Sequence, residues 1–326
     1  MVIKMKKTVI IGISVVILVI AATLVCISGQ TTAIPVMQKD VAEQTSSSQI
    51  PQSSDVAGRL SSKIILNTSV PEGIEKILLY KTVQPNVTKE LTLQYAKKFG
   101  VEGDLRGNTT VQSKNLTYYV LVSKNSGSIE YENQDRPTEK LDYPAVLPSD
   151  DEAIQIATTY IKERDLLPEG ANLITPPDRE YFYLLGEKEN TITHGQVCVV
   201  FGRTLNGLHV EGSYLVVDIG GHGDVIGFRS HWRSYEPDKE YPLISANEAF
   251  ETLRLQGVPV GMSDVDRVSI DRVYLAYQTE ANAFKESYLK PVWVFRGQVI
   301  QNGQSVRPVF QTIPALKEVP AELVSS

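Results

Sequence analysis

The sequence predicts an α+β fold, built of repeated units in which a helix packs on antiparallel β-hairpins, and preceded by one N-terminal transmembrane helix. Three observations support this prediction: helix-capping signals ahead of apolar residues at helical spacing, runs of alternating polarity joined by glycine-containing turns, and one long apolar run near the N-terminus. Alternation with a period of two indicates strands, whereas a period near 3.6 indicates helices.

Three helices are predicted from their start signals. Ser149 with Glu152, and Ser245 with Glu248, have the Ser-x-x-Glu spacing in which each side chain satisfies a backbone amide at the start of a helix. Apolar residues at helical spacing follow both pairs. A third, weaker helix is predicted to begin near Thr88. It ends before residue 100, because the glycine there readily adopts the conformation that terminates helices.

Paired strands are predicted where residues alternate in polarity on both sides of a turn. Residues 118–123 and 128–132 flank a turn that contains a glycine, and residues 214–219 and 225–232 flank a glycine-rich turn. The last part of the chain contains three further predicted strands, at residues 267–278, 289–300 and 305–312. Because helices and antiparallel hairpins alternate along the chain, each helix is expected to cover one face of a sheet.

An apolar run at residues 9–27 follows Lys4, Lys6 and Lys7, and no charged residue follows it before Lys39. A helix of about 19 residues rises about 28 Å, close to the thickness of the hydrocarbon layer of a membrane. The lysines favour a cytoplasmic N-terminus. We therefore expect a single-pass signal anchor in the cell membrane, with the C-terminal region extracytoplasmic.

A cleavable signal peptide is the alternative for this segment, and the protein would then be secreted. Signal peptides have a shorter apolar core, of about 7 to 15 residues, and end in a site of small residues. Residues 26–28 match such a site poorly, which favours the uncleaved anchor. Lipidation of Cys26 is disfavoured, because the bulky Val25 precedes it where a small residue is needed.

Composition and the recurrence of the predicted helix-and-hairpin unit divide the chain into segments. Residues 1–28 form the anchor or signal segment. Residues 29–60 are rich in Ser, Thr and Gln and lack a hydrophobic period, so a flexible stalk is expected. Three α+β units are predicted after the stalk, at residues 61–145, 146–240 and 241–320, and a short tail occupies 321–326.

The net charge limits the classes of partner that the protein can bind. The number of cysteines limits the contribution of disulfides to its stability. The net charge is −6, and without the three N-terminal lysines residues 29–326 carry −9. An acidic surface argues against nucleic acid or anionic lipid as the main partner. Cys198 is the only cysteine outside the apolar run, and it lies in the apolar residues 197–201. It is therefore expected to be a buried free thiol.

The sequence contains no strong signal for catalysis or metal binding. His194, His209, His222 and His231 share one short stretch, but no pair has the tight spacing of a zinc site. Residues 221–224 are expected to form a hairpin turn and not a dinucleotide loop, because a strand and not a helix follows. No Gly-x-Ser-x-Gly or His-Glu-x-x-His motif is present. We therefore expect no catalytic residue, no cofactor and no metal.

One predicted strand carries a candidate protein interface. Along residues 228–235, Phe228 and every second residue after it are expected to face the core. The intervening residues form a basic, aromatic stripe of the kind favoured at interface hot spots. These candidate interface residues are Arg229, His231, Arg233 and Tyr235. An ordinary solvated strand face is the alternative.

Four Asn-x-Ser/Thr sequons lie in the first half of the expected extracytoplasmic region, and they are candidate glycosylation sites. Their asparagines are Asn67, Asn86, Asn108 and Asn115.

Several stretches resemble known families. Residues 151–153 open a helix, and residues 207–212, 214–218 and 224–227 follow in an order that resembles PepSY-type modules. Such modules occur in propeptides of thermolysin-like proteases and in membrane-anchored regulators. Residues 289–295, Leu-Lys-Pro-Val-Trp-Val-Phe, are similar to the C-terminal part of the YycH and YycI regulators of a bacterial sensor kinase.

The resemblance covers roughly residues 149–313, and residues 85–135 more loosely. It implies binding or inhibition of a protein partner, without a catalytic group. Our hypothesis is a membrane-anchored, extracytoplasmic, non-catalytic regulatory protein that binds a protein partner at the membrane or cell envelope. A structural or adhesion component of the cell envelope is the alternative, and an enzyme is the third and least favoured.

Overall fold

The computed structural model describes residues 58–133, 146–184 and 191–321. The apolar run at residues 9–27, in which we expect the membrane anchor, lies outside these residues. Within the described part of the chain, no helix is long and apolar enough to cross a membrane.

The expected stalk and tail fall mostly outside the described residues. The end of the stalk region is an exception, since Arg59–Leu60 form strand β1. This strand pairs antiparallel with β13 (Val258–Pro259), which lies far away in sequence. Within the described residues, regular structure is therefore already present before residue 61, the expected start of the folded region.

The described residues consist mainly of β-strands with three α-helices, and the predicted α+β class is confirmed. The strands of the first half are β2 (Ile64–Leu66), β3 (Lys76–Val83), β4 (Gly103–Arg106), β5 (Thr110–Ser113), β6 (Tyr118–Val122) and β7 (Ile129–Asn133). Those of the second half are β8 (Ala171–Leu184), β9 (Thr191–Leu205), β10 (Leu208–Ile219), β11 (Val225–His231), β12 (Ser234–Pro242), β14 (Arg267–Gln278), β15 (Tyr288–Gln301) and β16 (Gln304–Pro314).

All three predicted helices are present, and each begins at its predicted cap. Helix α1 (Lys89–Lys98) is capped by Thr88, whose side chain accepts a hydrogen bond from the backbone N–H of Leu91. Helices α2 (Asp150–Glu163) and α3 (Ala246–Gln256) begin with complete capping boxes. In each box, the serine and the glutamate satisfy backbone donors that the helix itself leaves unpaired.

Apart from β1 and β13, the described strands form one fourteen-stranded network. Its main path runs β12-β3-β15-β14-β10-β11-β7-β6-β5-β4, and β16, β2, β8 and β9 branch from it. Nearly all neighbours are antiparallel, while β10 and β2 each pair parallel with β14. The predicted hairpins β6–β7, β10–β11 and β15–β16 are confirmed by their pairing.

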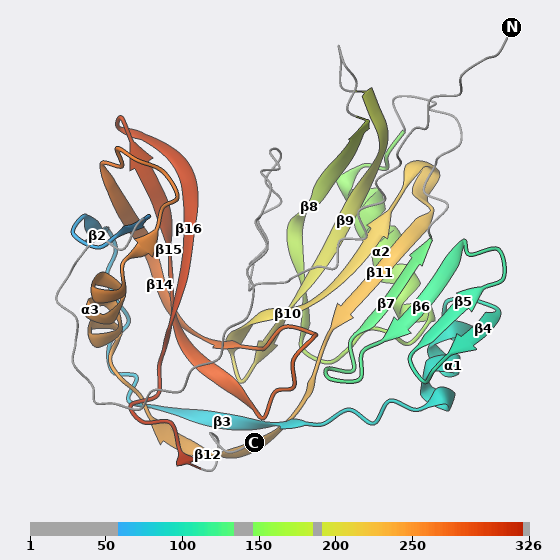
Figure 1. Cartoon of the computed structure of the whole chain (residues 1–326), viewed down its shortest axis with the longest axis horizontal. Coiled ribbons are helices and arrows are strands. Elements are labelled where there is room, and N and C mark those ends of the chain that lie inside the picture. Colours follow the sequence, from blue (N-terminus) through green and yellow to red (C-terminus); the bar gives the residue numbers. More distant parts are fainter. Residues whose placement is uncertain (1–57, 134–145, 185–190, 322–326) are drawn as a thin grey trace, which may run out of the picture.

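Two hydrophobic cores lie on this network. The first core joins residues of β3 and α3 with the inner residues of β14, β15 and β16. The second core joins α1 and α2 with strands β5, β6, β7, β9, β10 and β11. Each helix thus buries its apolar side against one face of a sheet, as the alternation of helices and hairpins predicted. Figure 1 shows α3 beside β14–β16, and α1 and α2 on the other group of strands.

The cores do not follow the sequence order of the predicted units. Residues 61–145, expected as one unit, contribute to both cores: Ile64, Ile77 and Leu79 belong to the first, whereas residues from Ala96 onward belong to the second. The reason is β3, which pairs antiparallel with β12 and β15. In Figure 1 the two long strands β3 and β12 run together along the bottom of the view.

Strand β10 connects the two groups of strands. Val210 and Glu211 pair parallel with β14, with Val210 opposite Tyr277, and residues 214–219 pair with β9 and β11. The change of partner and a shift in register occur around Gly212, which has a φ of 82°. A Cβ atom there would lie only 3.2 Å from the side chain of Thr279, so both the conformation and the space favour glycine.

Trp293 belongs to the first core. Its side chain is 1% exposed, and its indole N–H donates a hydrogen bond of 2.9 Å to the carbonyl oxygen of Ile244. Strand β15, which carries it, pairs with β14 on one side and with β16 on the other.

We predict that Trp293→Ala lowers the free energy of unfolding by about 3 to 5 kcal/mol, because it removes a large buried ring and leaves a cavity. Denaturant unfolding of the full-length protein in nonionic detergent measures this change. Trp232→Ala is the matched control, since Trp232 is partly exposed and its loss is expected to cost much less. Equal effects of the two substitutions would show that Trp293 does not anchor the core.

Candidate functional site

The strand that was expected to form an interface passes from one group of strands to the other. Its first part, β11, pairs with β10 and β7, and its continuation, β12, pairs with β3. Residues at the crossing are covered from both sides. The expected solvent-facing orientation is therefore wrong for His231 and Arg233, each of which is only 2% exposed. Arg229 and Tyr235 are partly exposed.

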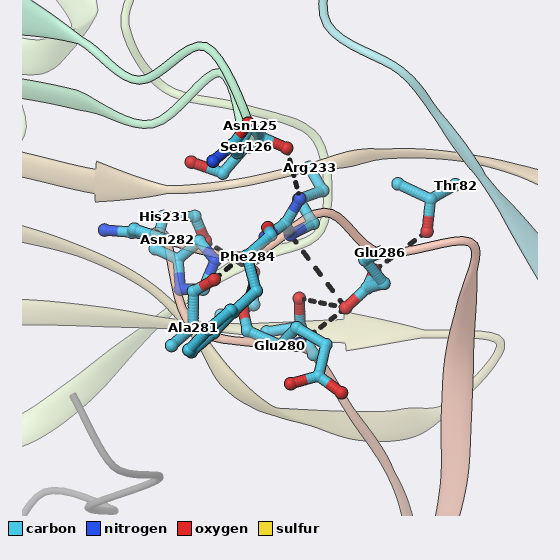
Figure 2. A network of polar contacts seen from close by, with 12 residues as sticks. Thr82, Asn125, Ser126, His231, Arg233, Glu280, Ala281, Asn282, Phe284 and Glu286 are labelled. Carbon is cyan, nitrogen blue, oxygen red and sulfur yellow. Dashed lines mark hydrogen bonds and ion pairs between the residues drawn. The ribbon is translucent and has the colours of Figure 1, made fainter. Parts of the chain in front are cut away.

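The side chain of Arg233 connects the β11–β12 crossing to the β6–β7 turn and to the β14–β15 loop. We call this meeting point of the three segments the junction. Its guanidinium donates hydrogen bonds to the carbonyl oxygens of Asn125 at 2.9 Å, Ala281 at 3.1 Å and Phe284 at 2.8 Å. Asn125 lies in the β6–β7 turn, whereas the other two lie in the loop between β14 and β15. Figure 2 shows the guanidinium between these segments.

Glu286 supplies the negative charge at the junction. Its carboxylate lies 3.9 Å from the Nε atom of Arg233, and both side chains are only 1% exposed. The same carboxylate accepts hydrogen bonds of 2.8 Å from the hydroxyls of Thr82 and Thr279, and one from the backbone N–H of Glu280. Thr82 belongs to β3, so the network reaches the long strand that crosses the molecule.

Further contacts hold the β6–β7 turn against the β14–β15 loop. The side chain of Asn125 donates to the carbonyl oxygen of Ala283 at 2.7 Å, and the hydroxyl of Ser128 lies 2.7 Å from the side-chain oxygen of Asn282. Ser123 donates to the carbonyl oxygen of Asn282 at 3.1 Å. The junction thus links the second core, which includes β6 and β7, to the first core, which includes β14 and β15.

His231 lies beside Arg233 and is neutral near pH 7. Burial, together with the positive charge of Arg233, lowers the pKa of His231 to about 4. The ring packs edge-on against Tyr214, with the ring centroids 5.8 Å apart. The backbone carbonyl of His231 accepts a hydrogen bond of 2.9 Å from the hydroxyl of Ser213. These contacts place His231 in the structural junction and not on an accessible interface.

Arg229 pairs with a buried carboxylate on the sheet face opposite α2. It donates to Asp218 at 2.9 Å, and Asp218 is 2% exposed. Burial, the largest single effect, disfavours the charged guanidinium, but Asp218 and the other acidic groups nearby together outweigh burial and raise the pKa of Arg229. The guanidinium is therefore committed to balancing a charge inside the protein, although part of its side chain reaches solvent.

Cys198 lies on the same face, and the prediction of a buried free thiol is confirmed. Burial, with the added effect of the carboxylates of Asp218 and Glu180, raises the pKa of the Cys198 thiol well above its usual value. A thiol that stays protonated is a poor nucleophile and a poor metal ligand.

A cluster that the sequence reasoning missed lies on the face of β14–β16 opposite the first core; we call it the arginine–tyrosine cluster. Its members are Glu211, Arg272, Tyr274, Arg296 and Phe310. Residues of this face form a small apolar cluster to which only strands contribute, whereas α3 packs on the other face. The alternation of Arg272 with Tyr274 along a predicted strand was the available sequence signal.

Tyr274 organises this cluster. Its hydroxyl donates to Glu211 at 2.7 Å and accepts a hydrogen bond of 2.8 Å from the Nε atom of Arg296. The guanidinium carbon of Arg272 lies 4.9 Å from the centre of the Tyr274 ring, and that of Arg296 lies 5.1 Å from the Phe310 ring. Arg272 is exposed, and Tyr274 and Phe310 are partly exposed.

The remaining histidines do not come together. His209 and His222 are exposed, and His222 adopts a φ of 63° in the short helix η1 (Gly221–Gly223), which joins β10 to β11 in the predicted hairpin turn. The side chain of His194 lies outside the described part. Among the residues that the structure describes, no group of three or more His, Cys, Asp or Glu side chains is arranged to hold a metal ion.

The four sequon asparagines lie on or near the surface. Asn67, Asn86 and Asn115 are exposed, and Asn108 is partly exposed. The side chain of Asn115 accepts a hydrogen bond of 2.8 Å from Ser113, and that of Asn67 donates to Ser269 at 3.2 Å. Their glycosylation stays a prediction.

Comparison with models of known protein families finds no match, and no curated protein matches the chain. Among solved structures, the crystal structure of an uncharacterized protein from Eubacterium rectale overlaps 78% of this chain and 90% of its own, at 11% sequence identity and a TM-score of 0.43.

We predict that Arg233→Met lowers the free energy of unfolding by about 3 to 5 kcal/mol, because it leaves the buried carboxylate of Glu286 without its cation. Arg254→Met is the control, since Arg254 forms only an exposed pair with Glu251 and its loss is expected to cost under about 1 kcal/mol. Adding Glu286→Gln to Arg233→Met should recover part of the loss. Denaturant unfolding gives the free energy of unfolding of wild type, of the two single variants and of the double variant. A loss no larger than that of the control would contradict the junction.

We predict that His231 makes stability fall as the pH drops. The unfolded chain takes up a proton at His231 near pH 6.5, whereas the folded chain does so only near pH 4. The stabilisation is complete above pH 6.5 and is lost towards pH 4. Between pH 7.5 and 4.5, wild type should lose about 2 to 3 kcal/mol more than His231→Gln. Equal losses in the two proteins would mean that His231 is accessible to protons in the folded state.

Proposed function

We propose that this chain is a membrane-anchored, extracytoplasmic protein that binds and regulates a protein partner without catalysing a reaction. The arginine–tyrosine cluster carries this proposal. It places two arginines and two aromatic rings on a sheet face to which no described helix contributes. Arginine and tyrosine are among the residues most enriched at binding hot spots.

The membrane anchor rests on the apolar run at residues 9–27 and on the lysines that precede it. An anchor would hold the folded region on the extracytoplasmic side, and the stalk would let it reach a partner at the membrane. The regulatory role rests on the resemblance of residues 151–153 and 207–227 to PepSY-type modules, and of residues 289–295 to the YycH and YycI regulators.

Because His231 and Arg233 are buried, only Arg229 and Tyr235 remain of the interface that the sequence suggested. Arg229 and Tyr235 keep partly exposed side chains, but Arg229 is paired with Asp218 and Tyr235 donates to Thr279 at 3.0 Å. Both have structural partners, whereas Arg272 of the arginine–tyrosine cluster is exposed. The cluster is therefore the better candidate for partner contact.

We predict that a photo-crosslinking residue at position 310 captures one protein partner in stoichiometric yield when the full-length protein is present in its native membrane. Position 255 is the control, because Leu255 is 65% exposed on α3 and lies away from the cluster. Immunoblotting and mass spectrometry identify the captured species. Retention of the protein by cell-wall material, with no partner captured from either position, would support a structural role in the envelope and contradict the proposal.

A further inference from the structure

The arginine–tyrosine cluster has an unbalanced positive charge. Arg272 and Arg296 are direct neighbours across strands β14 and β15, where like charges disfavour each other. Glu211 neutralises one of them, since its carboxylate lies 3.4 Å from a guanidinium nitrogen of Arg296 and is largely buried. One positive charge therefore remains among the members of the cluster, in a chain whose net charge is −6.

The orientations of the two guanidinium groups suit the binding of a planar anion. Both lie against the ring of Tyr274, at 4.9 Å for Arg272 and 5.8 Å for Arg296, so their orientations are restricted. A stacked guanidinium keeps the N–H groups at its edge available, and these match the two oxygens of a carboxylate. A carboxylate between the arginines would also relieve their mutual repulsion.

We propose that the arginine–tyrosine cluster binds an acidic segment of the protein partner, with a carboxylate of that segment placed between Arg272 and Arg296. This inference rests on the proposed function and names the chemistry of its partner. Tyr274 and Phe310 are partly exposed beside the arginines, above the buried Val292 and Val294, and their rings suit an apolar or aromatic neighbour of the carboxylate.

An acidic protein segment fits this face better than an anionic membrane surface does. Sites that recognise anionic lipid by charge usually present about four or more clustered Lys or Arg residues. This cluster presents two arginines, and one of them is already paired with Glu211. The overall negative charge of the chain also disfavours approach to an anionic membrane.

Binding of a labelled peptide of alternating glutamate and tyrosine tests the inference on the full-length protein in nonionic detergent. We expect the peptide to bind wild type and to lose at least about tenfold in affinity with Arg272→Gln, because Arg272 is the exposed hot-spot residue of the cluster. Arg272→Lys should give an intermediate loss, since lysine keeps the charge but lacks the planar fork. Arg106→Gln, which removes an exposed arginine from β4, should change nothing. A peptide with glutamine in place of glutamate should not bind.

Each other outcome overturns the inference. These outcomes are no binding of the acidic peptide, equal binding to wild type and Arg272→Gln, binding only to vesicles of anionic lipid, and crosslinking from position 310 to a second copy of the chain. Unchanged melting of Arg272→Gln shows that its fold is intact. If Arg272→Gln still captures a protein partner in membranes at undiminished yield, the proposed function stands and this inference alone fails.

Discussion

The buried guanidinium of Arg233 is the constraint on which the arrangement of this protein depends. A charged group removed from water is tolerated only if its donors and its charge find partners inside the protein. The terminal nitrogens of Arg233 donate to carbonyl oxygens of the β6–β7 turn and of the β14–β15 loop, and the carboxylate of Glu286 balances its charge, although the Nε atom of Arg233 has no hydrogen-bond partner. Because the turn and the loop join strands of different cores, the cores cannot separate without exposing or orphaning a charge.

The junction also explains why strands far apart in the sequence lie together. Glu286 is held by Thr82 of β3 and by Thr279 at the end of β14, so the carboxylate that balances Arg233 also holds the crossing strand in place. Strand β10 makes the second connection, because it pairs with β14 at Val210 and Glu211 and with β9 and β11 beyond Gly212. In the part of the chain that the structure describes, one fourteen-stranded network thus carries both cores.

The role of an arginine in this protein depends on whether its guanidinium is paired with a buried carboxylate or lies on the surface. Arg233 and Arg229 are paired with Glu286 and Asp218, and both carboxylates are almost completely buried. Such pairs specify one arrangement of the strands but leave little for a partner to contact. Arg272, by contrast, lies on the surface of a sheet face, and its charge is available for recognition.

The sequence by itself determined the local structure. The helices at Thr88, Ser149 and Ser245, the hairpins and the buried thiol of Cys198 all follow from side chains and backbone within a few residues, because caps, turns and alternation are local properties. The tertiary structure alone decided the pairing of β3 with β12 and the burial of Arg233. Alternation along a strand shows that two faces differ, but it cannot show that a turn and a loop from distant strands cover the polar one. That depends on contacts between distant segments, for which a single sequence carries no local signal.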